Sequence, residues 1–188
     1  MKIKYLGLTF LLFICFTSCQ KENDIFNDFR CPSLANKGDF ETVLDAKNNF
    51  SLDVPKHWKT ELYLNENSSI FTTADTTKQY LNTYLIKATL IESKLNLSFQ
   101  NIKKIKQSIL SDKTVKITSE KLGVFKKFPS LLLRTQSDKF KFGESVLHLY
   151  TPLSDNRYFE IEIHCFGAKK VDYRFCEAIG ILNSLKLN

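Results

Sequence analysis

Residues 50–58 read FSLDVPKHW, and this stretch marks where the folded part of the chain begins. From Phe50 to Val54, apolar residues alternate with polar ones, which is the period of a β-strand with one buried face. Pro55 has no amide hydrogen to give to a neighbouring strand, so it predicts the end of this strand. Trp58 follows just past the expected turn. We therefore expect a domain that opens at residue 49 with a hairpin.

Several more strands and one helix are predicted in the middle of the chain. The strands are expected over residues 61–64, 69–73, 80–92 and 115–121, and again after Pro129. Ser98 can accept a free backbone amide at a helix start. Apolar residues at helical spacing follow it as far as Leu110, with lysines between them. Gly123 predicts a turn between the last two of these strands.

The chain closes with a hairpin and a helix. Val146–Tyr150 and Tyr158–Phe166 are predicted strands, joined by the polar residues 154–156. From Val171 to Leu185 the apolar residues step by four, three, four and three, which indicates an amphipathic helix. Strands joined by hairpins form an antiparallel sheet, and each helix must cover apolar sheet surface. The prediction is an α+β fold with about six antiparallel strands and two main helices.

The order of these elements is similar to that of PsbP-like and DcrB-like domains. In those domains an alternating strand runs into a proline and a tryptophan, as it does at 50–58. The helix at 98–110, the glycine and proline stretch at 123–134 and the ending at 181–186 come where the family has them. The resemblance spans residues 50–188. It implies an α/β/α sandwich, and it implies a binding or assembly accessory without a shared catalytic set.

The first 24 residues have the layout of an export signal. A basic start is followed by an apolar run from Tyr5 to Phe16. A membrane-spanning helix needs about 20 apolar residues, so this run is too short to be one. The small pair before Cys19 resembles a bacterial lipobox, although Phe16 stands where that pattern has leucine. The resemblance implies that the signal peptide, residues 1–18, is removed and that the Cys19 sulfur is acylated. An ordinary signal peptide or an uncleaved anchor is the alternative.

Acyl chains on Cys19 would hold the protein stably on a bilayer. The polar run Gln20–Asp24 resembles the export tag of Bacteroidota lipoproteins, which directs them to the cell surface. We therefore expect a lipoprotein of the bacterial cell envelope, at the outer membrane and exposed on the surface. Residues 19–48 have few regularly spaced apolar residues and are expected to form a spacer, with one short element at 40–46. The domain then fills residues 49–188.

Charge and motifs limit the partners. Without its first 18 residues the chain has 25 basic and 20 acidic side chains, a net charge of +5. Such a mild and dispersed charge gives no reason to expect nucleic acid. The sequence has no phosphate-binding loop, dinucleotide fingerprint or nucleophile elbow, so we expect no cofactor. The expected partners are the membrane, through the lipid on Cys19, and a protein of the envelope.

Three cysteines remain after export and acylation. Cys15 is lost with the signal and Cys19 carries the lipid, which leaves Cys31, Cys165 and Cys176. Cys165 continues the alternation of its strand and is expected to be buried. Export permits a disulfide, and we favour the pair Cys31–Cys176, which would tie the spacer to the last helix. Sequence alone leaves the other pairings open.

The last hairpin contains the strongest candidate for chemistry. If Leu147 pairs with Ile163, His148 lies opposite Glu162, and directly opposed side chains are about 5 Å apart. His148, Glu162 and His164 could then meet, and two imidazoles with a carboxylate can bind zinc. The alternative is a polar sheet face with cross-strand contacts, and no His-x-x-x-His or Cys-x-x-Cys spacing favours the metal.

Two functions follow from these observations. The first is a lipid-anchored, non-enzymatic binding or accessory module with an unknown ligand. The second is a metal-dependent envelope enzyme that uses the His148, Glu162 and His164 face. The absence of a nucleophile signature favours the first function.

Overall fold

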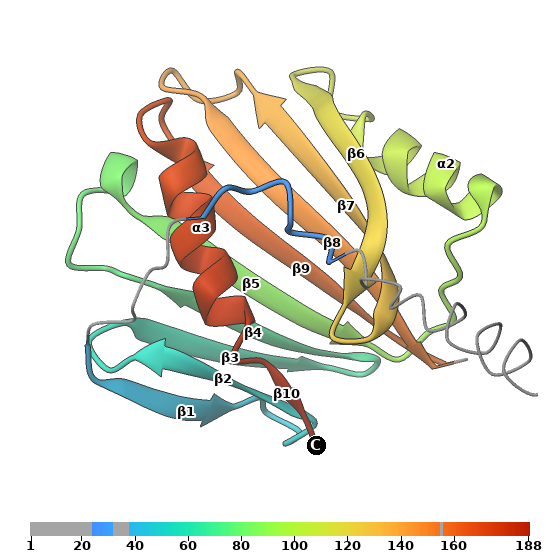
Figure 1. Ribbon diagram of the computed structural model, residues 1–188, viewed down its shortest axis with the longest axis horizontal. Helices are drawn as coiled ribbons and strands as arrows, with labels where there is room; N and C mark the ends of the chain where they lie inside the picture. The colour runs from blue at the N-terminus through green and yellow to red at the C-terminus, as the bar shows by residue number, and fades with distance from the viewer. Residues whose placement is uncertain (1–23, 32–37, 155) are drawn as a thin grey trace, which may run out of the picture.

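A computed structural model describes residues 24–31, 38–154 and 156–188 of the chain. Its larger sheet has seven antiparallel strands in the order β3-β4-β5-β9-β8-β7-β6 (Figure 1). These strands are β3 (Lys59–Asn65), β4 (Ser68–Ala74), β5 (Tyr84–Ile91), β6 (Val115–Phe125), β7 (Phe128–Ser137), β8 (Glu144–Ser154) and β9 (Arg157–Phe166). A smaller sheet has the order β1-β2-β10, with β1 (Phe40–Leu44), β2 (Phe50–Pro55) and β10 (Lys186–Leu187).

The larger sheet is built in two passes. The chain lays down β3, β4 and β5 as neighbours and then leaves the sheet to form helix α2 (Phe99–Ile109). It re-enters at the far edge as β6, and the hairpins β6 to β9 bring it back until β9 pairs with β5. The most distant edges of the sheet are therefore β3 and β6. No helix among the described residues is long and apolar enough to cross a membrane.

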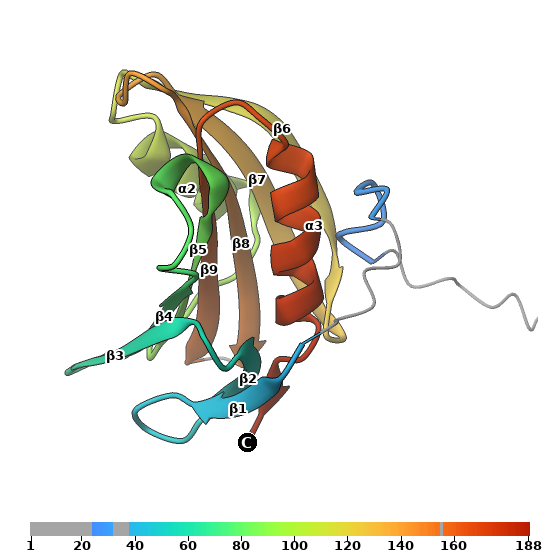
Figure 2. The ribbon, with the colours of Figure 1, turned by 90° about the vertical axis from the view of Figure 1, so that its left-hand side faces the viewer.

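The two main helices cover opposite faces of the larger sheet, as Figure 2 shows. Helix α3 (Val171–Leu182) packs on the face that contains Leu132 of β7. Helix α2 packs through Ile102 on the other face, against Leu131 and Leu133 of the same strand. Because side chains point alternately to the two faces along β7, this strand contributes residues to the cores on both sides of the sheet. The predicted α/β/α sandwich is confirmed, with seven strands in the larger sheet where about six were expected.

Two predicted boundaries differ from the structure. The strand expected from residue 80 begins at Tyr84, because Tyr80–Asn82 form a 3-10 turn. The turn expected at Gly123 lies at Lys126 and Lys127, whose φ angles are 50° and 73°. A two-residue hairpin turn needs this left-handed backbone, which asparagine and glycine usually provide. Two lysines give no such signal in the sequence.

Residues 24–31, which were expected to be part of a spacer, belong to the fold. Ile25 is fully buried, and its amide donates a hydrogen bond to the Val124 carbonyl of β6 at 3.0 Å. The ring of Phe29 contacts the ring of Phe175 on α3, with 6.3 Å between centroids. A disulfide joins Cys31 to α3, and β1 lies within the short element expected at 40–46. These apolar residues follow no strand or helix period, so the sequence pattern did not reveal them.

A buried arginine joins α3 to the loops at one end of the larger sheet. Arg174 is 4% exposed. Its guanidinium donates hydrogen bonds of 2.8–3.3 Å to the carbonyl oxygens of Leu81, Thr83, Phe166, Gly167 and Lys169. Since a buried guanidinium needs such acceptors, α3 and these two loops must form together.

Candidate functional site

The last hairpin has the predicted register. Leu147 pairs with Ile163, and His148 pairs with Glu162. The Nδ1 atom of His148 lies 3.4 Å from Oε1 of Glu162, and Nε2 of His164 lies 3.8 Å from the other oxygen of that carboxylate. The three side chains therefore meet around one carboxylate, on the sheet face that α2 covers.

Two further charged residues complete a group that we call the polar cluster: Lys87, Glu144, His148, Glu162 and His164. Lys87 of β5 lies opposite Glu162 in the sheet, and its Nζ is 2.8 Å from Oε2. Glu144 accepts a hydrogen bond from Nδ1 of His164 at 2.8 Å. Each carboxylate of the polar cluster thus has a cationic or imidazole partner, as mostly buried charges require.

The pairing shifts the pKa values of two members strongly. Burial by itself raises the pKa of Glu162, but the imidazoles of His148 and His164, at 3.4 and 3.8 Å, and the hydrogen bond from Lys87 outweigh it and hold the pKa far below its ordinary value. Burial by itself lowers the pKa of His164, but the hydrogen bond to Glu144 and the nearby carboxylate of Glu162 outweigh it and raise the pKa to about 9. His164 is therefore an imidazolium at neutral pH, with a carboxylate beside each ring nitrogen.

The polar cluster is built as a set of ion pairs. Among residues 24–31, 38–154 and 156–188, no group of three or more His, Cys, Asp or Glu side chains has the arrangement of a metal site. Beside the cluster is a cavity of about 330 Å³, to which Ser108 and Ile109 of α2 contribute.

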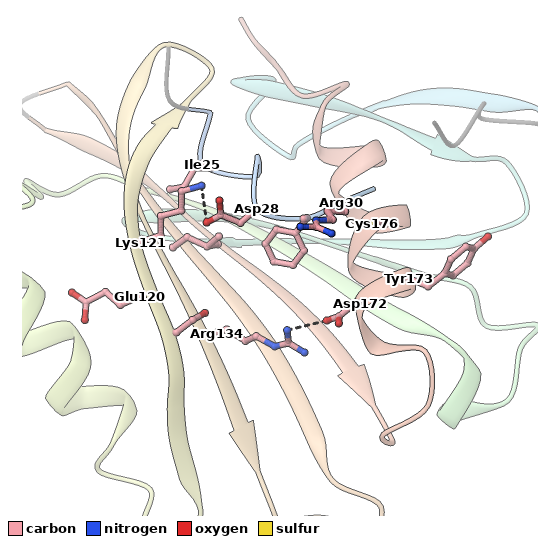
Figure 3. Close-up of a pocket in the computed structure, with 12 residues that line it drawn as sticks. Ile25, Asp28, Arg30, Glu120, Lys121, Arg134, Asp172, Tyr173 and Cys176 are labelled. Atoms are coloured by element: carbon pink, nitrogen blue, oxygen red, sulfur yellow. Dashed lines mark ion pairs between the residues drawn. The ribbon is translucent and has the colours of Figure 1, made fainter. Parts of the chain in front are cut away.

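A second cavity lies on the other face of the sheet, and the sequence analysis did not predict it (Figure 3). Its volume is about 590 Å³, and we call it the N-terminal cavity because residues 25–30 form one wall. The other walls come from β6, β7 and α3. Its lining includes the apolar side chains of Ile25, Phe29, Leu132 and Cys176, together with Lys121 and Arg134.

The charges of the N-terminal cavity are unevenly exposed. Lys121 and Arg134 have side chains only 20% and 25% exposed. Nζ of Lys121 lies 3.0 Å from Asp28, and Nη1 of Arg134 lies 2.9 Å from Asp172 (Figure 3). These carboxylates are 76% and 75% exposed. Lys121 and Arg134 therefore sit in the wall, and their partners sit at the rim. The exposed residues Arg30 and Glu120 also line the cavity.

Arg134 is only partly satisfied. Its guanidinium carbon lies 5.3 Å from the centre of the Phe175 ring, a distance at which a cation is attracted to the ring face. Its Nε is buried and has no hydrogen-bond partner within the described part of the chain. Neither Lys121 nor Arg134 was singled out in the sequence analysis. The one sequence signal for this cavity was the pairing of Cys31 with Cys176, because it brings the segment onto α3.

Comparisons with known proteins support the fold. No protein-family profile and no curated protein sequence matches this chain. The structure is similar to cyanobacterial PsbP (CyanoP) from Synechocystis, with a TM-score of 0.53 and 7% sequence identity, over 84% of this chain and 97% of that one. The chain therefore has a PsbP-like fold, as the sequence resemblance implied.

Two other solved structures are less similar. One is a Bacteroides thetaiotaomicron protein, with a TM-score of 0.44 and 15% identity over 80% of this chain and 48% of that one. The other is the Pseudomonas aeruginosa protein PA94, of unknown function, with a TM-score of 0.47 and 8% identity over 76% and 94%. Both TM-scores are below that of the Synechocystis protein.

Proposed function

We propose that this chain is a lipid-anchored protein of the bacterial cell envelope and that its PsbP-like domain is a non-enzymatic binding or accessory module. One observation carries the proposal. The N-terminal cavity, at about 590 Å³, is within the range of about 300–1,000 Å³ typical of ligand pockets. Its wall is made by the segment that directly follows the predicted acylation site, so binding and anchoring would involve neighbouring residues.

In this proposal the cavity lies close to the membrane. Ile25 is six residues after Cys19, and six extended residues span at most about 20 Å. Ile25 is in turn bonded to β6. An acylated Cys19 would therefore hold this side of the domain near the bilayer.

The pairing within the polar cluster supports a binding module over a metal-dependent enzyme. Glu162 and His164 are engaged with their neighbours at distances of 2.8–3.8 Å. A general acid, a general base or a metal ligand must present a group of suitable pKa to a substrate. The charges here neutralise one another instead.

The anchor is tested with two single cysteine substitutions in the full chain. Cys19→Ser removes the sulfur that accepts the acyl chains. We therefore expect this variant to carry no lipid and to be lost from the membrane fraction. Cys15→Ser is the matched control, since it lies in the removed signal and should leave acylation intact. Mass spectrometry of the mature N-terminal peptide and cell fractionation report the result. An unmodified thiol at Cys19 in the wild-type protein would refute the anchor.

We further propose that the protein reaches the outer membrane and the cell surface, where it meets a protein of the envelope. The support is the polar run after Cys19. Protease treatment of intact cells should degrade the wild-type protein and spare a periplasmic marker. Substituting residues 20–24 with alanine should protect the protein from the protease while acylation continues. Protection of the wild-type protein would contradict surface exposure.

A further inference from the structure

We propose that the N-terminal cavity binds a small molecule with an anionic head group on an apolar body. The inference deepens the proposed binding function and rests on it. Neither the fold nor any compared protein assigns a ligand to this cavity.

The cations are placed for an anion that arrives from solvent. Lys121 and Arg134 are mostly buried, while Asp28 and Asp172, which pair with them, are about three-quarters exposed. Ion pairs with such exposed partners add little stability, so a ligand anion can replace the carboxylates at small cost. The planar guanidinium of Arg134 suits a carboxylate or a phosphate, which it can bind through two hydrogen bonds.

The rest of the lining is suited to an apolar body. The ring of Phe29 is only partly buried, and it lines the cavity beside the buried side chains of Ile25 and Leu132. A free inorganic anion would leave this surface in contact with water. A molecule with an acyl or similar chain would cover it, and burial of that chain would add affinity. The combination selects an amphiphile, with its head at Lys121 and Arg134 and its chain against the ring of Phe29.

The cavity is held open before any ligand arrives. Residues 25–30 are fixed at one end by the hydrogen bond from Ile25 to Val124 and at the other by the disulfide to Cys176. A wall that is already ordered loses little conformational freedom on binding. Carboxylate and phosphate head groups share the chemistry described, so the experiment includes both.

The test is isothermal titration calorimetry of the purified mature chain in phosphatidylcholine nanodiscs, with empty nanodiscs as the blank. The probes are octanoate and octyl phosphate, and the reference compounds are 1-octanol and acetate. We expect saturable one-site binding of octanoate, octyl phosphate or both, and the tighter of the two identifies the head group. Equal binding of 1-octanol, or no saturable binding of either acid, would overturn the proposal.

Variants locate the site. Arg134→Gln and Lys121→Gln should each weaken binding about tenfold or more, because each removes a charge-assisted hydrogen bond. Lys47→Gln is the control, since Lys47 is also part of a partly buried ion pair, with Glu92, away from the cavity. If Arg134→Gln unfolds the protein, Lys121→Gln still tests whether the ligand binds in this cavity. Equal weakening by Lys47→Gln would overturn the assignment.

Failure of this inference can be distinguished from failure of the proposed function. Calorimetry works on the purified chain whether or not Cys19 is acylated. An acylated, membrane-bound protein that binds neither acid refutes the ligand class and leaves the anchor standing. A protein that binds the acids but carries a free Cys19 thiol refutes the anchor and leaves the ligand class standing.

Discussion

Cys31 and Cys176 are joined by a disulfide across 145 positions of the sequence, with their Cα atoms 5.2 Å apart. One partner follows the predicted acylation site by twelve residues, and the other lies in the middle of α3. The bond therefore ties the first described segment to the helix that covers the sheet. Cys176 also lines the N-terminal cavity, so the same bond holds the cavity wall.

Removing this disulfide should destabilise the protein. A cross-link over so long a stretch restricts the unfolded chain, and the loss of a native disulfide typically costs about 2–5 kcal/mol. We expect the double variant Cys31→Ser, Cys176→Ser to lose about this much free energy of unfolding in urea. Dithiothreitol should lower the stability of the wild type and leave the double variant unchanged. An identical wild-type unfolding curve with and without dithiothreitol would contradict the bond.

Stability should fall between pH 6.5 and 9 because of His164. Its pKa is about 9 in the folded protein and 6.5 in the unfolded chain, so the folded state binds the proton more tightly. This stabilisation is complete below pH 6.5 and is lost as the pH rises through 9, by up to about 3 kcal/mol. His164→Gln should flatten the unfolding free energy in this window. His57→Gln, at an exposed imidazole, should preserve the slope.

The contribution of Glu162 to stability has the opposite pH dependence. Its folded pKa lies below the ordinary value of 4.5, so its stabilisation is present above pH 4.5 and is lost as the pH falls further. Glu162→Gln should remove this acid dependence and leave His148 and Lys87 without their shared carboxylate. Urea unfolding measured from pH 3 to 6 reports the effect. Unchanged acid sensitivity in Glu162→Gln would show that other carboxylates dominate.

Arg174 should be among the most sensitive positions. It is buried and bonded to five carbonyl oxygens in two loops. Arg174→Met leaves these acceptors without donors, and breaking such a buried polar network costs about 3–5 kcal/mol. We expect faster amide exchange in residues 81–83 and 166–169 as well. Arg157→Met, at an exposed arginine, should change neither measurement.

The sequence predicted what periodicity encodes. Alternation placed Leu147 and Ile163 toward the core, and the pairing of His148 with Glu162 followed from it. The same reasoning found the cap of α2, where the Ser98 hydroxyl accepts the Asn101 amide at 3.4 Å. These features depend on neighbours within one strand pair or one helical turn, so a local pattern suffices to find them.

The N-terminal cavity could not be predicted in the same way. Its walls come from residues 25–30, Lys121, Arg134 and Cys176, which meet only when α3 and the first segment dock on the same sheet face. The protonation of His164 escaped the sequence for a related reason. The pattern placed Glu162 beside it, but the predicted strand began at Val146 and left out Glu144, which is a diagonal neighbour of His164 in the sheet.

Ile25→Ala tests whether the first described segment is part of the domain. Ile25 is fully buried in the core that α3 covers, so truncating it leaves a cavity and should cost about 2–5 kcal/mol. A residue in a solvated spacer would cost nothing. Asn27→Ala is the matched control, because its side chain is exposed in the same segment. Urea unfolding followed by Trp58 fluorescence reports both variants, since Trp58 lies in the same core. Equal stabilities for Ile25→Ala and Asn27→Ala would return residues 24–31 to the spacer, and the cavity would then lose one of its walls.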